Sequence, residues 1–113
     1  MKREVIGAHY GWRDWLAQRI TAVIMLLYTL FFLAVLVSLP ARDYDHWKAL
    51  FTLPVMRYAT MIFVLAVAYH AWVGVRNIFM DYIKDTGLRL TFYVLVIIAL
   101  IVYVVWAAQI LWG

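Results

Sequence analysis

The sequence contains no cysteine, which excludes both a disulfide framework and a thiolate metal site. Charged residues are scarce as well: they make up 14% of the 113 residues, and none occurs after Arg89. Hydrophobic residues make up 68% of the chain, whereas roughly half is usual in a soluble domain. A soluble fold of this length cannot shield so much apolar surface. The lipid bilayer is therefore expected to be the solvent for most of the chain.

Other absences narrow the class of protein further. No apolar stretch precedes Trp15, so no cleaved signal peptide is expected. We find no internal repeat and no low-complexity tract, which favours one small membrane domain over residues 1–113. The formal net charge of +4 is explained by Lys and Arg in cytoplasmic segments. No nucleic-acid partner is predicted.

Three long apolar runs predict an all-α membrane protein with three transmembrane helices in an up-down-up bundle. The expected spans cover about residues 15–39, 56–79 and 89–112. Pro40 ends the first span, because proline removes a backbone donor and clashes with the preceding turn.

The segments that flank the first span are predicted to be polar. Residues 1–13 are expected to form a short arm with Gly7 and Gly11 as breakers, and Asp14 to cap the first helix. After the first span, Asp43 is expected to cap a short amphipathic helix that lies in the membrane interface.

The distribution of Lys and Arg predicts the orientation. Seven of these residues flank the N-terminal side of the first span and the second connection, against three in the first loop. The positive-inside rule then places the N-terminus in the cytoplasm and the C-terminus outside. We expect a multi-pass protein of a bacterial inner (cytoplasmic) membrane.

The second span carries a histidine inside an apolar run. Ionisable residues at membrane depth are costly and mark functional sites by default. On a helix, His70, Gly74, Asn77 and Asp81 fall on one stripe, and Gly74 lets a flat, bulky group approach the backbone. Asp81 and Tyr82 lie about 16–18 Å further along the same helix.

Two interpretations of His70 stay open on spacing alone. Imidazole is a common axial ligand of haem iron, but a histidine hydrogen-bonded between two helices fits the pattern as well. The chain has no other intramembrane histidine, so a bis-histidine haem needs a second polypeptide. Thr21 and Tyr28 share a face of the first span and favour hydrogen bonds between helices.

Three further polar residues also allow two interpretations each. Tyr82 is either a loop residue or a hydrogen-bond donor to a carbonyl oxygen of a lipophilic ligand, with Asp81 orienting an arginine or delivering protons. Arg19 either extends to the lipid headgroups or reaches an anionic group near the same membrane face.

Two stretches of the sequence resemble the hydrophobic membrane anchor subunit of succinate dehydrogenase. The first is the run Asp14-Trp15-Leu16-Ala17-Gln18-Arg19-Ile20-Thr21-Ala22. The second is the run His70-Ala71-Trp72-Val73-Gly74, followed at the family's separation by Asp81-Tyr82. The three spans and the length agree as well, so the resemblance covers nearly the whole chain.

The resemblance implies a haem b between two anchor subunits, with His70 as one axial iron ligand and Arg19 near the propionates. It implies a ubiquinone site in which Tyr82 binds the quinone and Asp81 is its acidic neighbour. The implied partners are a second, cytochrome b-type anchor subunit, an iron–sulfur subunit and a flavoprotein subunit. Some family members carry a histidine where this chain has Arg13, so no role is transferred there.

The chain is accordingly expected to be a non-catalytic subunit of succinate:quinone oxidoreductase (complex II). One alternative is the anchor of a fumarate reductase, which has the same architecture and runs the reaction in reverse. Another is a small transporter or membrane subunit without a cofactor. A transporter of this size is expected to carry a membrane-embedded carboxylate, and none lies in the three apolar runs.

Overall fold

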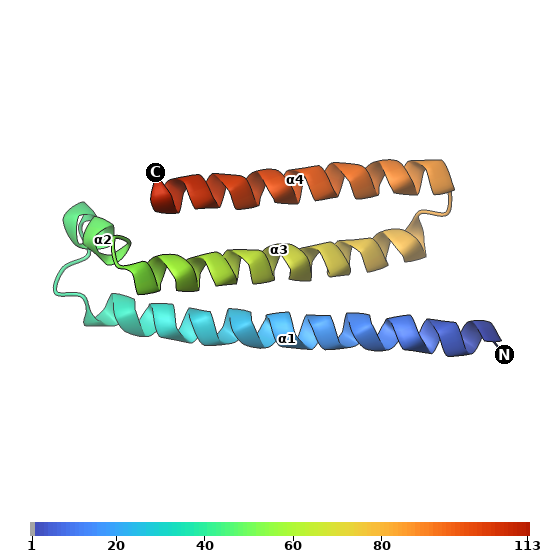
Figure 1. Cartoon of the computed structure of the whole chain (residues 1–113), viewed down its shortest axis with the longest axis horizontal. Helices are drawn as coiled ribbons and strands as arrows, with labels where there is room; N and C mark the ends of the chain where they lie inside the picture. Colours follow the sequence, from blue (N-terminus) through green and yellow to red (C-terminus); the bar gives the residue numbers. More distant parts are fainter. Residues whose placement is uncertain (1) are drawn as a thin grey trace.

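The chain folds into three long helices and one short one. The computed structural model describes the backbone of residues 2–113 and the side chains from Trp12 onward. The helices are α1 (Lys2–Ser38), α2 (Tyr44–Leu50), α3 (Pro54–Tyr82) and α4 (Thr86–Trp112). The three long helices run in alternating directions (Figure 1), which confirms the predicted up-down-up order.

Each long helix contains a stretch that is long and apolar enough to cross a membrane. These stretches are Trp12–Ser38, Pro54–Tyr82 and Thr86–Trp112. At 1.5 Å per residue each is about 40 Å long, which exceeds the roughly 30 Å of a bilayer's hydrocarbon core. The predicted multi-pass membrane architecture is confirmed, whereas the orientation in the membrane stays a prediction.

The predicted polar arm at residues 1–13 is wrong, because α1 already begins at Lys2. A glycine in a helix interior costs about 1 kcal/mol relative to alanine, so Gly7 and Gly11 weaken a helix without having to end it. The expected cap at Asp14 is also wrong, because this residue lies well inside α1.

Helix α2 confirms the amphipathic piece predicted between the first two spans. Asp43 is its N-cap and accepts a hydrogen bond from the backbone N–H of His46 at 3.0 Å. Trp47 and Phe51 pack against Phe32 of α1, with ring centroids 5.9 and 6.4 Å apart. These aromatic contacts hold α2 against the end of the first span.

The connection between α3 and α4 is shorter than the one predicted between the second and third spans. Helix α3 continues through Asp81 to Tyr82, and α4 begins at Thr86. Asp85 caps α4 by accepting a hydrogen bond from the backbone N–H of Leu88 at 2.8 Å. Asp81 and Tyr82 therefore occupy the last turn of α3 and not a loop.

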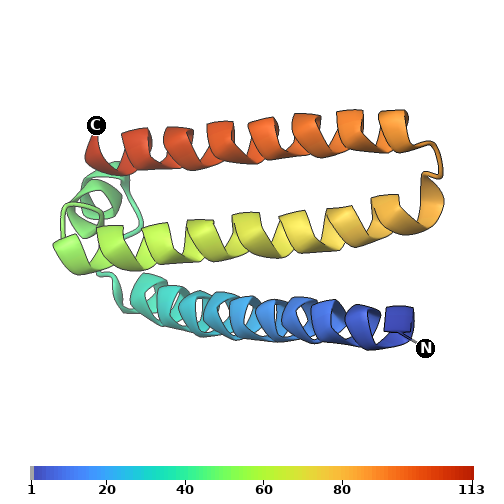
Figure 2. The ribbon, with the colours of Figure 1, turned by 45° about the vertical axis from the view of Figure 1, so that its right-hand side comes forward.

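Helix α3 lies between α1 and α4, and the two outer helices are not packed against each other (Figures 1 and 2). The molecule is elongated, with extents of 60 × 25 × 20 Å. Val73 of α3 is the only large side chain that is fully enclosed among the described residues. The three helices thus form an open row, in which most large apolar side chains are exposed.

Candidate functional site

Polar side chains line the interface between α1 and α3 along most of its length. As α1 advances, its residues meet progressively earlier residues of α3, as antiparallel packing requires. The successive pairs are Asp14 with Arg76, Gln18 with Gly74, Thr21 with His70, and Tyr28 with Thr60. The interhelical hydrogen bonds predicted for Thr21 and Tyr28 are both confirmed, at 2.9 and 2.7 Å.

The hydroxyl of Thr21 connects the His70 ring to the backbone of α1. Its oxygen lies 2.7 Å from the carbonyl oxygen of Ala17, 3.2 Å from that of Gln18 and 2.9 Å from Nδ1 of His70. A hydroxyl both donates and accepts, so it can bond a carbonyl and the ring at the same time. In the tautomer whose Nδ1–H donates to Thr21, Nε2 carries a free lone pair.

The contact with Thr21 engages one ring nitrogen in the way that is usual for a metal-binding histidine. Ligating histidines commonly donate their second ring N–H to a neighbouring acceptor, which fixes both tautomer and ring orientation. Nε2 of His70 forms no hydrogen bond within the part of the chain that the structure describes. The bond to Thr21 is also the interhelical bond that the alternative interpretation predicts, but it engages only one of the two ring nitrogens.

Gly74 lies one turn beyond His70, and its small size is not required by the packing of α1 on α3. A Cβ atom built there would lie 3.7 Å from Nε2 of Gln18, which is an ordinary van der Waals contact. The position where a side chain of residue 74 would project is next to the Gln18 side chain of α1, so the approach of a bulky, flat group to Gly74 stays a prediction.

The ion pair between Asp14 and Arg76 was not predicted from the sequence. Both side chains are about one-third exposed, and together they join α1 to α3. Nε of Arg76 and Oε1 of Gln18 are buried without a hydrogen-bond partner among the described residues. The available signal was an acid and a base at the same membrane face on neighbouring spans.

The other predicted site residues lie apart from His70. Tyr82 is 80% exposed at the end of α3, about 18 Å along the helix from His70. Asp81 beside it is exposed as well. Arg19 is exposed on α1, where its guanidinium lies 5.2 Å from the centroid of the Trp15 ring. The structure brings His70 together with Thr21 and leaves the remaining candidates on the surface.

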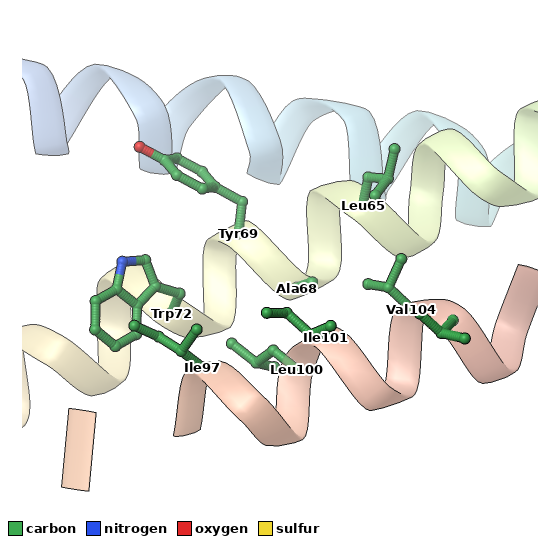
Figure 3. A pocket seen from close by; sticks show the side chains of 9 residues that line it. Leu65, Ala68, Tyr69, Trp72, Ile97, Leu100, Ile101 and Val104 are labelled. Atoms are coloured by element: carbon green, nitrogen blue, oxygen red, sulfur yellow. The ribbon is translucent and has the colours of Figure 1, made fainter. Parts of the chain in front are cut away.

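A groove of about 490 Å³ runs between α3 and α4, and no pattern in the sequence indicated it. Figure 3 shows Trp72 of α3 beside Ile97 and Leu100 of α4, with Tyr69 further along the same wall. The lining contains neither a charged residue nor a metal ligand. It is therefore distinct from the polar α1–α3 interface that holds His70.

Comparison with known proteins identifies the family. A family model described as the succinate dehydrogenase/fumarate reductase transmembrane subunit matches residues 1–106. This chain belongs to that family. The succinate dehydrogenase hydrophobic membrane anchor subunit of Coxiella burnetii is 39% identical over 102 residues, which cover 90% of this chain and 89% of that protein. The chain is a membrane anchor subunit of a succinate dehydrogenase/fumarate reductase complex, and so a non-catalytic part of an oxidoreductase.

The resemblance seen in the sequence of this anchor subunit is thereby confirmed. The structure adds that the two stretches that carry it are in contact. The runs 14–22 and 70–74 carry the resemblance, although nearly fifty residues separate them. In the anchor subunit they pack against each other across the α1–α3 interface, joined by the bond between Thr21 and His70.

Proposed function

We propose that this anchor subunit serves a succinate:ubiquinone oxidoreductase and that His70 is an axial ligand of a haem b shared with a second anchor subunit. The observation that supports the proposal most directly is the hydrogen bond between Nδ1 of His70 and Thr21, which leaves Nε2 as the ring nitrogen without a partner among the described residues. The relative from Coxiella burnetii is named as a succinate dehydrogenase subunit, which favours succinate oxidation over fumarate reduction.

The residues of this chain can hold one side of a haem, and the other side needs a partner. His70 supplies a nitrogen ligand whose ring orientation is held by Thr21. Arg19 is an exposed cation on α1 that propionate carboxylates can reach. A haem held in this way supplies one-electron redox chemistry. The second axial ligand must come from the partner, because the spans of this chain contain no other histidine.

The last turn of α3 is proposed to be this chain's part of a ubiquinone site. The hydroxyl of Tyr82 is exposed, so it can donate a hydrogen bond to a quinone carbonyl oxygen at the membrane surface. The carboxylate of Asp81 lies beside it and can orient a cation or pass a proton. We place this end of α3 at the cytoplasmic face, where the iron–sulfur and flavoprotein subunits are expected to dock.

The proposal is tested by the haem spectrum of the assembled complex carrying His70→Tyr. The substitution replaces the imidazole by a phenolic group, so the low-spin b-type spectrum should be lost or altered. His46→Gln is the matched control, because His46 lies in α2, outside the candidate membrane spans. An unaltered low-spin haem in the His70 variant would assign the ligand to another residue.

A further inference from the structure

A second groove lies at the end of the molecule opposite Tyr82. It has a volume of about 500 Å³ and is enclosed by α2, the start of α3 and the end of α4. Figures 1 and 2 both show α2 close to these two helix ends. Aromatic rings from α2 form one wall, and aliphatic side chains of α3 and α4 form the floor; they include Trp47, Phe51, Val64, Ile110 and Leu111.

Two cations line this groove, Lys48 from α2 and Arg57 from the first turns of α3. Nζ of Lys48 lies 5.9 Å from the centroid of the Tyr44 ring, and Nε of Arg57 donates to the carbonyl oxygen of Phe51 at 2.8 Å. Among the described residues, neither cation has a carboxylate within ion-pair distance. The two positive charges are therefore not paired within the described chain.

The acidic residues of the adjoining loop do not neutralise these two cations. Asp43 is engaged by the backbone and ring nitrogens of His46, and Asp45 does not line the groove. The two threonines that line the groove already donate or share their hydroxyl hydrogens, Thr52 with the Ala49 carbonyl and Thr60 with Tyr28. A neutral ligand finds few free donors here, whereas an anion finds two cations.

We propose that this groove binds an anionic phospholipid. The phosphate lies between Lys48 and Arg57, and an acyl chain follows the aliphatic floor between α3 and α4. Trp and Tyr side chains favour the headgroup level of a bilayer, and Trp47 and Tyr44 both line the groove. Each Lys or Arg near an anionic lipid surface improves binding about fivefold. The proposal concerns residues far from His70 and Tyr82, so its outcome is independent of the haem and quinone assignments.

The test uses the assembled complex in nanodiscs of phosphatidylcholine that contain increasing fractions of phosphatidylglycerol. The complex should show a saturable rise in its thermal midpoint with phosphatidylglycerol, and the rise should weaken with added salt. Lys48→Gln should shift the half-saturating lipid fraction upward about fivefold. Arg57→Lys should retain most of the response, because it keeps the charge even though it loses the fork geometry.

Arg42→Gln is the matched control, since Arg42 is a cation of the same loop that does not line this groove. It should respond to phosphatidylglycerol as the unmodified complex does. The proposal is overturned if Lys48→Gln behaves like the Arg42 variant, or if phosphatidylcholine alone gives the full effect. It is also overturned if a neutral quinone competes with phosphatidylglycerol for the groove.

Discussion

The hydroxyl oxygen of Thr21 lies 2.9 Å from Nδ1 of His70 and 2.7 Å from the carbonyl oxygen of Ala17, so one hydroxyl connects the two helices and holds the orientation of the imidazole ring. Thr21→Val keeps the shape of the side chain and removes the hydroxyl. Loss of such a supporting bond typically weakens metal binding by ten- to a hundredfold. We expect reduced haem occupancy or a shifted reduction potential, measured by redox titration of the reduced-minus-oxidised spectrum.

Thr29→Val is a suitable control for this prediction. Thr29 lies on the same helix, and its hydroxyl donates to the Met25 carbonyl at 2.7 Å, but it makes no bond to α3 among the described residues. If both valine variants changed the haem equally, the effect would come from the α1 backbone and not from His70.

The quinone assignment predicts a selective defect in Tyr82→Phe. Removing the hydroxyl deletes a hydrogen bond worth about 0.5–1.5 kcal/mol, which corresponds to a several-fold loss of quinone reductase activity. Succinate oxidation with a soluble artificial acceptor should persist. Tyr58→Phe, at the other end of α3 and also exposed, should leave both activities unchanged. Equal quinone activity in the Tyr82 variant would remove this residue from the site.

The ion pair between Asp14 and Arg76 predicts a stability effect that depends on both partners. Exposed pairs contribute about 0.2–1 kcal/mol, and breaking a fully buried pair costs about 3–5 kcal/mol. Because both side chains are about one-third exposed, we expect a value between these ranges. Thermal dissociation of the complex with Asp14→Asn, Arg76→Gln and the double variant would give the coupling energy. Strictly additive effects would show that the two residues act separately.

The cap of α2 predicts a response to acid. Hydrogen bonds from the backbone N–H and the ring of His46 hold the pKa of Asp43 below its ordinary value of 3.8. Stabilisation of α2 by this carboxylate is therefore complete above pH 3.8 and is lost as the pH falls through the lower folded-state pKa. Amide exchange in residues 44–50 should quicken over that acid range.

Two variants separate the cap from the charge. Asp43→Ala should quicken exchange in α2 already at neutral pH, because alanine provides no acceptor. Asp43→Asn should behave like the unmodified protein at neutral pH and lose the acid response, since asparagine caps helices well but does not ionise in this range. Unchanged exchange in the alanine variant would show that packing of Trp47 and Phe51 alone holds α2.

The sequence predicted the helices because apolar runs of this length have few alternatives in a membrane. It also predicted the cap at Asp43 and the hydrogen-bonding roles of Thr21 and Tyr28, because polar groups within lipid need partners. These predictions depend on local composition and on the helical spacing of residues, both of which can be read directly from the sequence.

Other features depend on which helix faces meet, and composition does not determine this. Asp14 resembled an N-cap because Asp is common there, yet its carboxylate is used by Arg76 from a distant span. The two glycines near the N-terminus resembled breakers, but their helical cost is small enough for α1 to continue through them.

The central position of α3 gives it shielded residues that the outer helices lack over most of their length. Val73 and Ala66 are shielded within this chain, so substitutions there would measure how the three helices hold one another. Leu27 of α1 and Ile98 of α4 face outward, so substitutions there would measure what the surroundings supply. A mutational scan of this chain, compared between the isolated subunit and the assembled complex, would therefore map partner contacts at the exposed positions, with Val73 and Ala66 as the internal reference.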